Sequence, residues 1–119
     1  MKRKNLGKWG ESKAEAFLKE NGVRILARNV RNSYGEIDLI AEEDHTLIFV
    51  EVKTAKTKKF GFPEVSVNKK KQQKLVECAL AHMQEKPNQD SAWRIDVVAV
   101  YVLSDNRIEI KWFKNAISG

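Results

Sequence analysis

The most informative hydrophobic pattern lies in the middle of the chain, at residues 47–53 (Leu-Ile-Phe-Val-Glu-Val-Lys). Side chains alternate between the two faces of a β-strand, so Leu47, Phe49 and Glu51 share one face and the aliphatic residues between them share the other. Apolar side chains on both faces are typical of a strand that is covered on both sides. The pattern therefore predicts a central strand that ends in two charged residues, Glu51 and Lys53.

Hydrophobic periodicity also predicts six flanking elements. Helical spacing predicts one helix at residues 6–21, ended by Gly22, and a second at residues 66–85, capped by Ser66 or Asn68. Alternating and β-branched runs predict the remaining strands, at residues 23–30, 35–41, 93–103 and 107–113. The element order α-β-β-β-α-β-β predicts an α/β fold in which helices flank a central mixed sheet of about five strands.

The length of 119 residues fits a single domain, 1–119. Within it, residues 1–5 are predicted to form a disordered basic arm. Residues 54–65, which are polar and basic without periodicity, are predicted to form a mobile loop beside the central strand.

Composition narrows the class of protein. No apolar run approaches the roughly 20 residues that span a bilayer, and no hydrophobic segment follows the basic start as in a signal peptide. Cys78 is the only cysteine, so neither an intrachain disulfide nor a cysteine zinc site is expected. We therefore expect a cytoplasmic protein that has no membrane partner.

The charge of the chain is unevenly distributed. The net charge is +6, from 22 Lys and Arg against 16 Asp and Glu. Residues 53–74 hold eight lysines and one glutamate, a net charge of +7, so the rest of the chain sums to −1. Positive charge concentrated after the central strand favours a polyanionic partner. A lysine-rich surface that serves only solubility is the alternative.

A second acidic strand precedes the central one, and the polar turn at residues 42–45 predicts a hairpin between them. If Ala41 pairs with Thr46, Asp38 and Glu51 become diagonal neighbours, with Cβ atoms about 7–8 Å apart. Carboxylates on one face repel one another unless a cation lies among them. This register therefore predicts a divalent metal site, which a slip of one residue would abolish.

The charged end of the central strand has an ordinary interpretation as well. Glu51 and Lys53 form an E-x-K triplet, and such residues at a strand end usually pair with each other in solvent.

The spacing of these charges resembles a known nuclease motif. Asp38, 12 intervening residues and then Glu51-x-Lys53 resemble the PD-(D/E)XK motif of restriction-endonuclease-like folds. An ordered set of segments across residues 5–102 also resembles the YraN family of bacterial proteins: Gly10-Glu11, Arg28-Asn29, 35–41, 49–53, Phe60-Gly61-x-Pro63 and 96–100.

The resemblance implies a restriction-endonuclease-like fold, similar also to archaeal Holliday junction resolvases. It implies a Mg²⁺ or Mn²⁺ ion held by Asp38, Glu51 and the carbonyl of Val52, because hard oxygen ligands suit these ions. Lys53 is then expected to orient or deprotonate a water molecule. Glu11 is expected either to aim from the first helix into this site as a further catalytic or metal-binding group, or simply to reach water.

Three other features bear on the site. Glu36 is a reserve candidate on the same face as Asp38. Asp96 matches the family, but a structural salt bridge to Arg94 or to a lysine is the favoured interpretation. The family commonly has an arginine shortly after the E-x-K lysine, where this chain has Ala55-Lys56; a lysine there replaces a planar, bidentate phosphate contact with a point charge.

Lysines and one glutamine provide candidates for nucleic-acid binding. The second predicted helix has an apolar stripe of Val76, Ala79, Leu80 and Met83. Projected backward at the helical period, Lys69 and Gln73 fall on this stripe, whereas Lys71 points away. The candidates are Lys56, Lys58, Lys59, Lys69 and Gln73.

The sequence thus supports two hypotheses. The first is a Mg²⁺- or Mn²⁺-dependent endonuclease that hydrolyses DNA phosphodiester bonds, on branched or structured DNA and in a possible homodimer, with DNA favoured over RNA. The second is a non-catalytic module of nuclease-like fold that binds nucleic acid or a protein partner.

Overall fold

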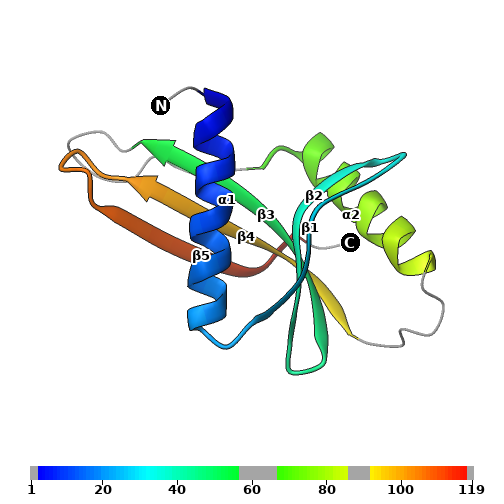
Figure 1. The fold of residues 1–119 in the computed structure, drawn as a ribbon. Helices are drawn as coiled ribbons and strands as arrows, with labels where there is room; N and C mark the ends of the chain where they lie inside the picture. Colours follow the sequence, from blue (N-terminus) through cyan, green and yellow to red (C-terminus); the bar gives the residue numbers. More distant parts are fainter. Residues whose placement is uncertain (1–2, 57–66, 86–91, 118–119) are drawn as a thin grey trace.

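The computed structural model describes residues 3–56, 67–85 and 92–117, which form one five-stranded sheet with a helix on each face (Figure 1). The elements, in chain order, are α1 (Arg3–Glu20), β1 (Arg24–Asn32), β2 (Gly35–Glu43), β3 (Thr46–Lys56), α2 (Lys69–Gln84), β4 (Trp93–Val102) and β5 (Ile108–Ile117). This order and the mixed five-stranded sheet confirm the predicted architecture.

The strands lie side by side in the order β1-β2-β3-β4-β5. All neighbouring pairs are antiparallel except β3 and β4, which are parallel. Parallel neighbours need a long crossover, and α2 lies within the connection that supplies it. None of the helices in the described ranges is long and apolar enough to cross a membrane.

Two predicted boundaries are wrong. Helix α1 begins at Arg3, so residues 3–5 are helical and not part of a disordered arm. Strand β3 continues to Lys56, because its pairing with β4 extends as far as Lys56 opposite Val102. The predicted loop therefore cannot begin at residue 54, and the rest of it, residues 57–65, lies outside the described residues, as do residues 1–2.

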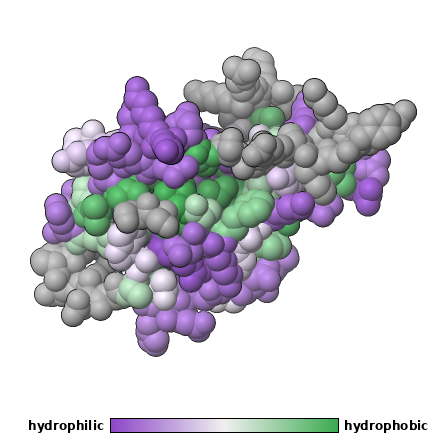
Figure 2. All heavy atoms as spheres, turned by 180° about the vertical axis from the view of Figure 1, so that it is seen from behind, coloured by the Kyte–Doolittle hydropathy of each residue, from purple (hydrophilic) through white to green (hydrophobic). Residues whose placement is uncertain are grey.

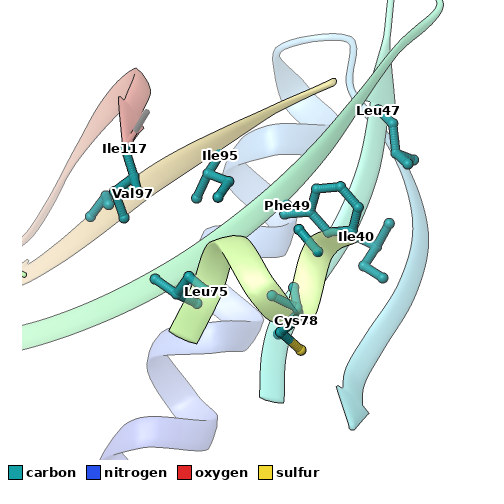
Figure 3. Close-up of a cluster of buried hydrophobic side chains, with 10 residues drawn as sticks. Ile40, Leu47, Phe49, Leu75, Cys78, Ile95, Val97 and Ile117 are labelled. Atoms are coloured by element: carbon teal, nitrogen blue, oxygen red, sulfur yellow. The ribbon is translucent and has the colours of Figure 1, made fainter. Parts of the chain in front are cut away.

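The hydrophobic core has one layer on each face of the sheet. On one face, Leu75 and Cys78 of α2 pack with Phe49 and Ile40 (Figure 3). On the other, Ala14 and Leu18 of α1 pack with Val50 and with buried residues of β2 and β4. Strand β3 contributes to both layers, as its apolar pattern predicts.

Helix α2 does not cover its whole face of the sheet. In the view from behind, hydrophobic atoms form a band between hydrophilic regions (Figure 2). An apolar groove of about 160 Å³ lies on this side, lined in part by Val97, Phe113 and Ile117. Within the described residues, the side of the sheet formed by β4 and β5 is therefore less fully covered than the region beneath α2.

The turn between β2 and β3 sets the register of the hairpin, and it is shorter than predicted. Asp44 and His45 both have positive φ, 49° and 62°, as in the two-residue turns that fit the natural twist of hairpins. Glu43 therefore pairs with Thr46, whereas the predicted four-residue turn paired Ala41 with Thr46. The register moves by two positions, so residues 39–43 and 46–50, which pair in this hairpin, stay on their predicted faces. Alternation breaks at Asp38, because Ile37 packs in the layer of Phe49 whereas Leu39 packs in the layer of Val50.

Helix α1 lies very close to β3 at one point. A Cβ atom built on Gly10 would lie 1.8 Å from Thr54 Oγ1 and 3.0 Å from Thr54 Cβ. Glycine is therefore required there, because any larger residue would push the helix away from the strand. This contact fixes the position of the next residue, Glu11.

We predict that Gly10→Ala destabilises the protein although alanine favours helices. The contact with Thr54 should cost about 1–3 kcal/mol, more than the gain of about 1 kcal/mol in helix propensity. The matched control is Gly7→Ala in the same helix, where no neighbouring element of the described structure lies within 4 Å of the new Cβ and stability should rise. Urea unfolding of both variants measures the difference, and equal stabilities would show that α1 does not need this close approach.

Candidate metal centre

The centre of the site is the point where β2 and β3 separate. Leu39 opposite Val50 is the last registered pair, and Asp38 and Glu51 are the next residues of the two strands. Beyond it the backbone pairing stops, and the Val52 N–H donates instead to Asp38 Oδ2 at 2.8 Å. The two strands then diverge (Figure 1).

This geometry brings the two predicted metal-binding carboxylates together. The side chains of Asp38 and Glu51 share a hydrogen bond, although the two residues lie beyond the registered pairs of β2 and β3. The shift of register also moves Glu36 away from its predicted place opposite Glu51.

Glu51 is a buried carboxylate with an unsatisfied oxygen. The residue is 6% exposed, and among the described residues its Oε2 atom has no hydrogen-bond partner. Burial, followed by the hydrogen bond and the charge of Asp38, raises the pKa of Glu51 to about 7. The charges of Lys71 and Lys53 act in the opposite direction and lower it. A buried group in this state is stabilised either by a proton or by a cation.

Glu11 approaches the same site from α1. Burial and the charge of Asp38 raise its pKa. The Asn29 amide, in the orientation that satisfies its neighbours, donates to Glu11 Oε1 at 3.0 Å and to Glu36 Oε1 at 3.1 Å. Of the two alternatives for Glu11, the contacts favour the one in which it faces the other carboxylates, and the bridge from Asn29 was not predicted.

A groove of about 210 Å³ between α1 and β1 opens onto Glu11. Arg28 and Glu15 both line this groove, and Arg28 donates from two nitrogen atoms to the two carboxylate oxygens of Glu15. This pair lowers the pKa of Glu15 to about 2. Arg31 donates from Nε to Glu36 Oε2, at 2.8 Å. Both arginines are thus engaged with carboxylates of the protein itself.

Lys53 lies two residues beyond Glu51 and is half-buried at a position opposite Ala99 of β4. Among the described residues, no partner forms a hydrogen bond or an ion pair with its ammonium group. Its charge reaches Glu51, whose pKa it lowers. The structure therefore brings together Asp38, Glu51 and Lys53, the three residues of the predicted motif.

The residues of this site fit a hard divalent cation. Among the described residues, no three side chains of the His, Cys, Asp and Glu types converge as a complete metal-binding set. Asp38 and Glu51 supply two carboxylates, and one buried oxygen of Glu51 accepts no hydrogen bond within the described part of the chain. Ions such as Mg²⁺ bind through one or two carboxylates and keep several water molecules, so a complete protein cage is not required.

The nucleic-acid candidates are only partly brought together. Lys56 is exposed at the end of β3, and Lys58 and Lys59 lie outside the described residues. Lys69 is exposed, and Gln73 is exposed and donates to Glu77 at 3.1 Å. The expectation that Lys69 and Gln73 line the buried face of the helix is therefore wrong.

The residue of α2 that reaches the site is Lys71. Its Nζ atom lies 3.6 Å from Glu51 Oε2, although the sequence pattern placed Lys71 on the outer face. The buried residues of α2 are Leu75, Cys78, Ala79 and His82, whereas Leu80 is 42% exposed. A stripe drawn through Leu75 and Cys78, extended backward by one turn, leads to Lys71.

Asp96 has a structural role. It is fully buried and pairs with Val50 in the register of β3 and β4, and Val50 packs on the α1 face, opposite the layer of Phe49. Its carboxylate accepts hydrogen bonds from Arg94, from Trp112 Nε1 at 2.8 Å and from the Asn115 N–H at 2.8 Å. The predicted salt bridge to Arg94 is confirmed, at 3.0 Å.

Comparison with known proteins gives one consistent result. The sequence profile of the Uncharacterised protein family UPF0102 matches residues 10–100 of this chain. A UPF0102 protein of Caldicellulosiruptor saccharolyticus is 42% identical over 117 residues, which cover 98% of this chain and 99% of the relative. Another, from Geotalea daltonii, is 43% identical over 113 residues, which cover 95% and 89% of the two chains.

The raised pKa of Glu51 predicts how stability depends on pH in the absence of metal. The folded protein retains a proton on Glu51 that the unfolded chain loses above about pH 4.5, so wild-type stability should fall as pH rises from about 4.5 to 7. Glu51→Gln cannot lose this proton. We predict that the variant gains stability relative to wild type across this window, by about 3 kcal/mol at most.

Chemical denaturation in EDTA at pH 5 and pH 8 tests this prediction. Glu109→Gln, at an exposed position of β5, controls for the general loss of a carboxylate. An advantage of Glu51→Gln that is the same at both pH values would mean that the buried carboxylate does not hold the proton.

Proposed function

This chain belongs to the UPF0102 protein family, and from its carboxylate site we propose that it is a metal-dependent nuclease that hydrolyses DNA phosphodiester bonds. The observation that carries the proposal is the contact of Asp38 with the buried Glu51, next to Lys53, in which one Glu51 oxygen accepts no hydrogen bond from the described residues. The spacing of these residues resembles that of the PD-(D/E)XK nucleases, and the mixed sheet with a helix on each face is compatible with that superfamily.

Each residue of the site has a proposed role. Asp38, Glu51 and the carbonyl of Val52 would hold Mg²⁺ or Mn²⁺. When bound, such an ion lowers the pKa of a coordinated water molecule and offsets negative charge on a phosphate. Lys53 would orient the attacking water or accept its proton, and its positive charge would stabilise the charge that develops on the phosphate.

Glu11 and Glu36 have supporting roles in this proposal. The Asn29 amide donates to both carboxylates, and burial, together with the charges of Asp38 and Glu36, raises the pKa of Glu11. Glu11 is therefore placed to accept a hydrogen bond from water or to hold a proton.

The proposed substrate is nucleic acid because the strongly basic segment, residues 53–74, begins at the site itself. Lys53, Lys56 and Lys71 belong to this segment, and the first and last of them flank Glu51. DNA of branched or structured form is the proposed target, acted on in the cytoplasm, and pairing of two copies would let the protein span such a substrate.

One observation favours a second candidate function, a non-catalytic module that binds nucleic acid or a protein. Among the described residues, the ion pair of Lys71 with Glu51 already gives the carboxylate site a cation from the protein. A module of this kind would keep the basic segment and use the carboxylates only as structural partners.

We predict that Mn²⁺ or Mg²⁺ activates cleavage of at least one member of a panel of duplex, flap, junction and single-stranded DNA, with RNA of the same sequences tested in parallel. Glu51→Gln and Lys53→Met should each reduce the rate by at least about 100-fold. Glu109→Gln, far along the sheet in β5, should retain the wild-type rate.

Binding measured in Ca²⁺ separates the two candidate functions. Salt-sensitive binding that persists in Glu51→Gln, with metal-dependent cleavage in the wild type, supports the nuclease. Binding without cleavage of any substrate by the wild type would contradict it and leave the non-catalytic module.

A further inference from the structure

Lys71 is the cation that the protein itself places beside the candidate metal centre. Its Nζ atom lies 3.6 Å from Glu51 Oε2, the oxygen that has no hydrogen-bond partner among the described residues. The contact is thus an ion pair without a hydrogen bond. The Lys71 side chain is 44% exposed, whereas that of Glu51 is 8% exposed. One partner is therefore fixed in the interior and the other reaches it from solvent.

The backbone of Lys71 is held firmly although its side chain is not. Asn68 caps α2, and its Oδ1 atom accepts a hydrogen bond from the Lys71 N–H at 2.8 Å. One turn later Leu75 is buried against the sheet. Lys71 thus begins the inward stripe of the helix, and rotation about its own side-chain bonds is enough to move the ammonium away from Glu51.

We propose that Lys71 is a displaceable counter-cation that stabilises Glu51 and Asp38 in the metal-free protein and leaves when a divalent ion binds. This inference rests on the proposed function, because it requires that Asp38 and Glu51 bind metal. Lys71 acts through Glu51 and is a positioning residue.

Electrostatic repulsion favours departure of the Lys71 ammonium when a divalent ion binds to Asp38 and Glu51. A divalent ion among the carboxylates and an ammonium group beside Glu51 repel each other strongly in a site with little water. The ammonium can return to solvent at small cost, because it is already partly hydrated and makes no hydrogen bond to Glu51. A divalent ion has twice its charge and can contact both carboxylates. Lys71 therefore weakens metal binding while it stabilises the metal-free site.

The inference predicts opposite effects of one substitution on two measurements. Lys71→Met should lower the melting temperature in EDTA at pH 8 by about 2–5 °C. The same variant should bind Mn²⁺ roughly three- to tenfold more tightly in calorimetric titration, because the competing charge is gone.

The matched control is Lys70→Met, in the same first turn of α2, which also removes a positive charge from the helix N-terminus. Lys70 is exposed, and this variant should resemble the wild type in both measurements. Asp38→Asn should abolish Mn²⁺ binding and thereby identify the site being titrated.

The outcomes separate this inference from the proposed function. Equal or weaker Mn²⁺ binding by Lys71→Met than by the wild type would overturn the role of Lys71 and leave the nuclease proposal intact. Absence of Mn²⁺ binding by the wild type would overturn both.

Discussion

The structure around the site depends on two carboxylates that are buried next to each other. Asp38 and Glu51 face each other where β2 and β3 separate, and burial together with Asp38 raises the pKa of Glu51 to about 7. A sheet gains no stability from such a pair, because each charge loses hydration and repels the other. The Val52 N–H offsets part of this cost by donating to Asp38. The remaining charge needs a proton, the ammonium of Lys71 or a metal ion, and the chemistry of the site follows from which of these is present.

The rest of the fold keeps this arrangement in place. The two-residue turn at Asp44 and His45 fixes the register that opposes the two carboxylates. On the α1 face, the approach of Gly10 to Thr54 holds the helix against β3 just beyond the site. Asp96 organises the neighbouring part of the sheet, because it binds the Asn115 N–H where the pairing of β4 and β5 is irregular. Its full set of partners explains why a second buried carboxylate close by has no part in the proposed chemistry.

The fold and the pairing of Asp38 with Glu51 could be predicted from the sequence because strand patterns tolerate an error in register. Strand alternation has a period of two, so a register wrong by two residues still placed Asp38 and Glu51 on the same side of the hairpin. Helix α2 has no such tolerance, because each residue turns by about 100°. The prediction treated Leu80 as buried, so the predicted apolar stripe of the helix was rotated and included Lys69 and Gln73. In the structure Leu75 and Cys78 are buried, and the same face of the helix carries Lys71, which reaches Glu51. The Asn29 bridge could not be predicted, because it depends on a positive φ at Asn29 and on the packing of α1 against β1.

The basic segment and the acidic site make physical sense together only if cations mediate between them. Glu11, Glu36, Asp38 and Glu51 form a negatively charged region that would repel a phosphate backbone, yet the segment that begins at Lys53 attracts one. A cation among the carboxylates removes this conflict, because it neutralises the pair and leaves the surrounding lysines to attract the polyanion. A purely structural ion pair with Lys71 would neutralise Glu51 but would also remove one of the lysines nearest to the site from any role in binding. The proposed exchange of Lys71 for a divalent ion would resolve both problems, since the ion would bind the buried oxygen and the ammonium of Lys71 would return to the surface where a phosphate would arrive.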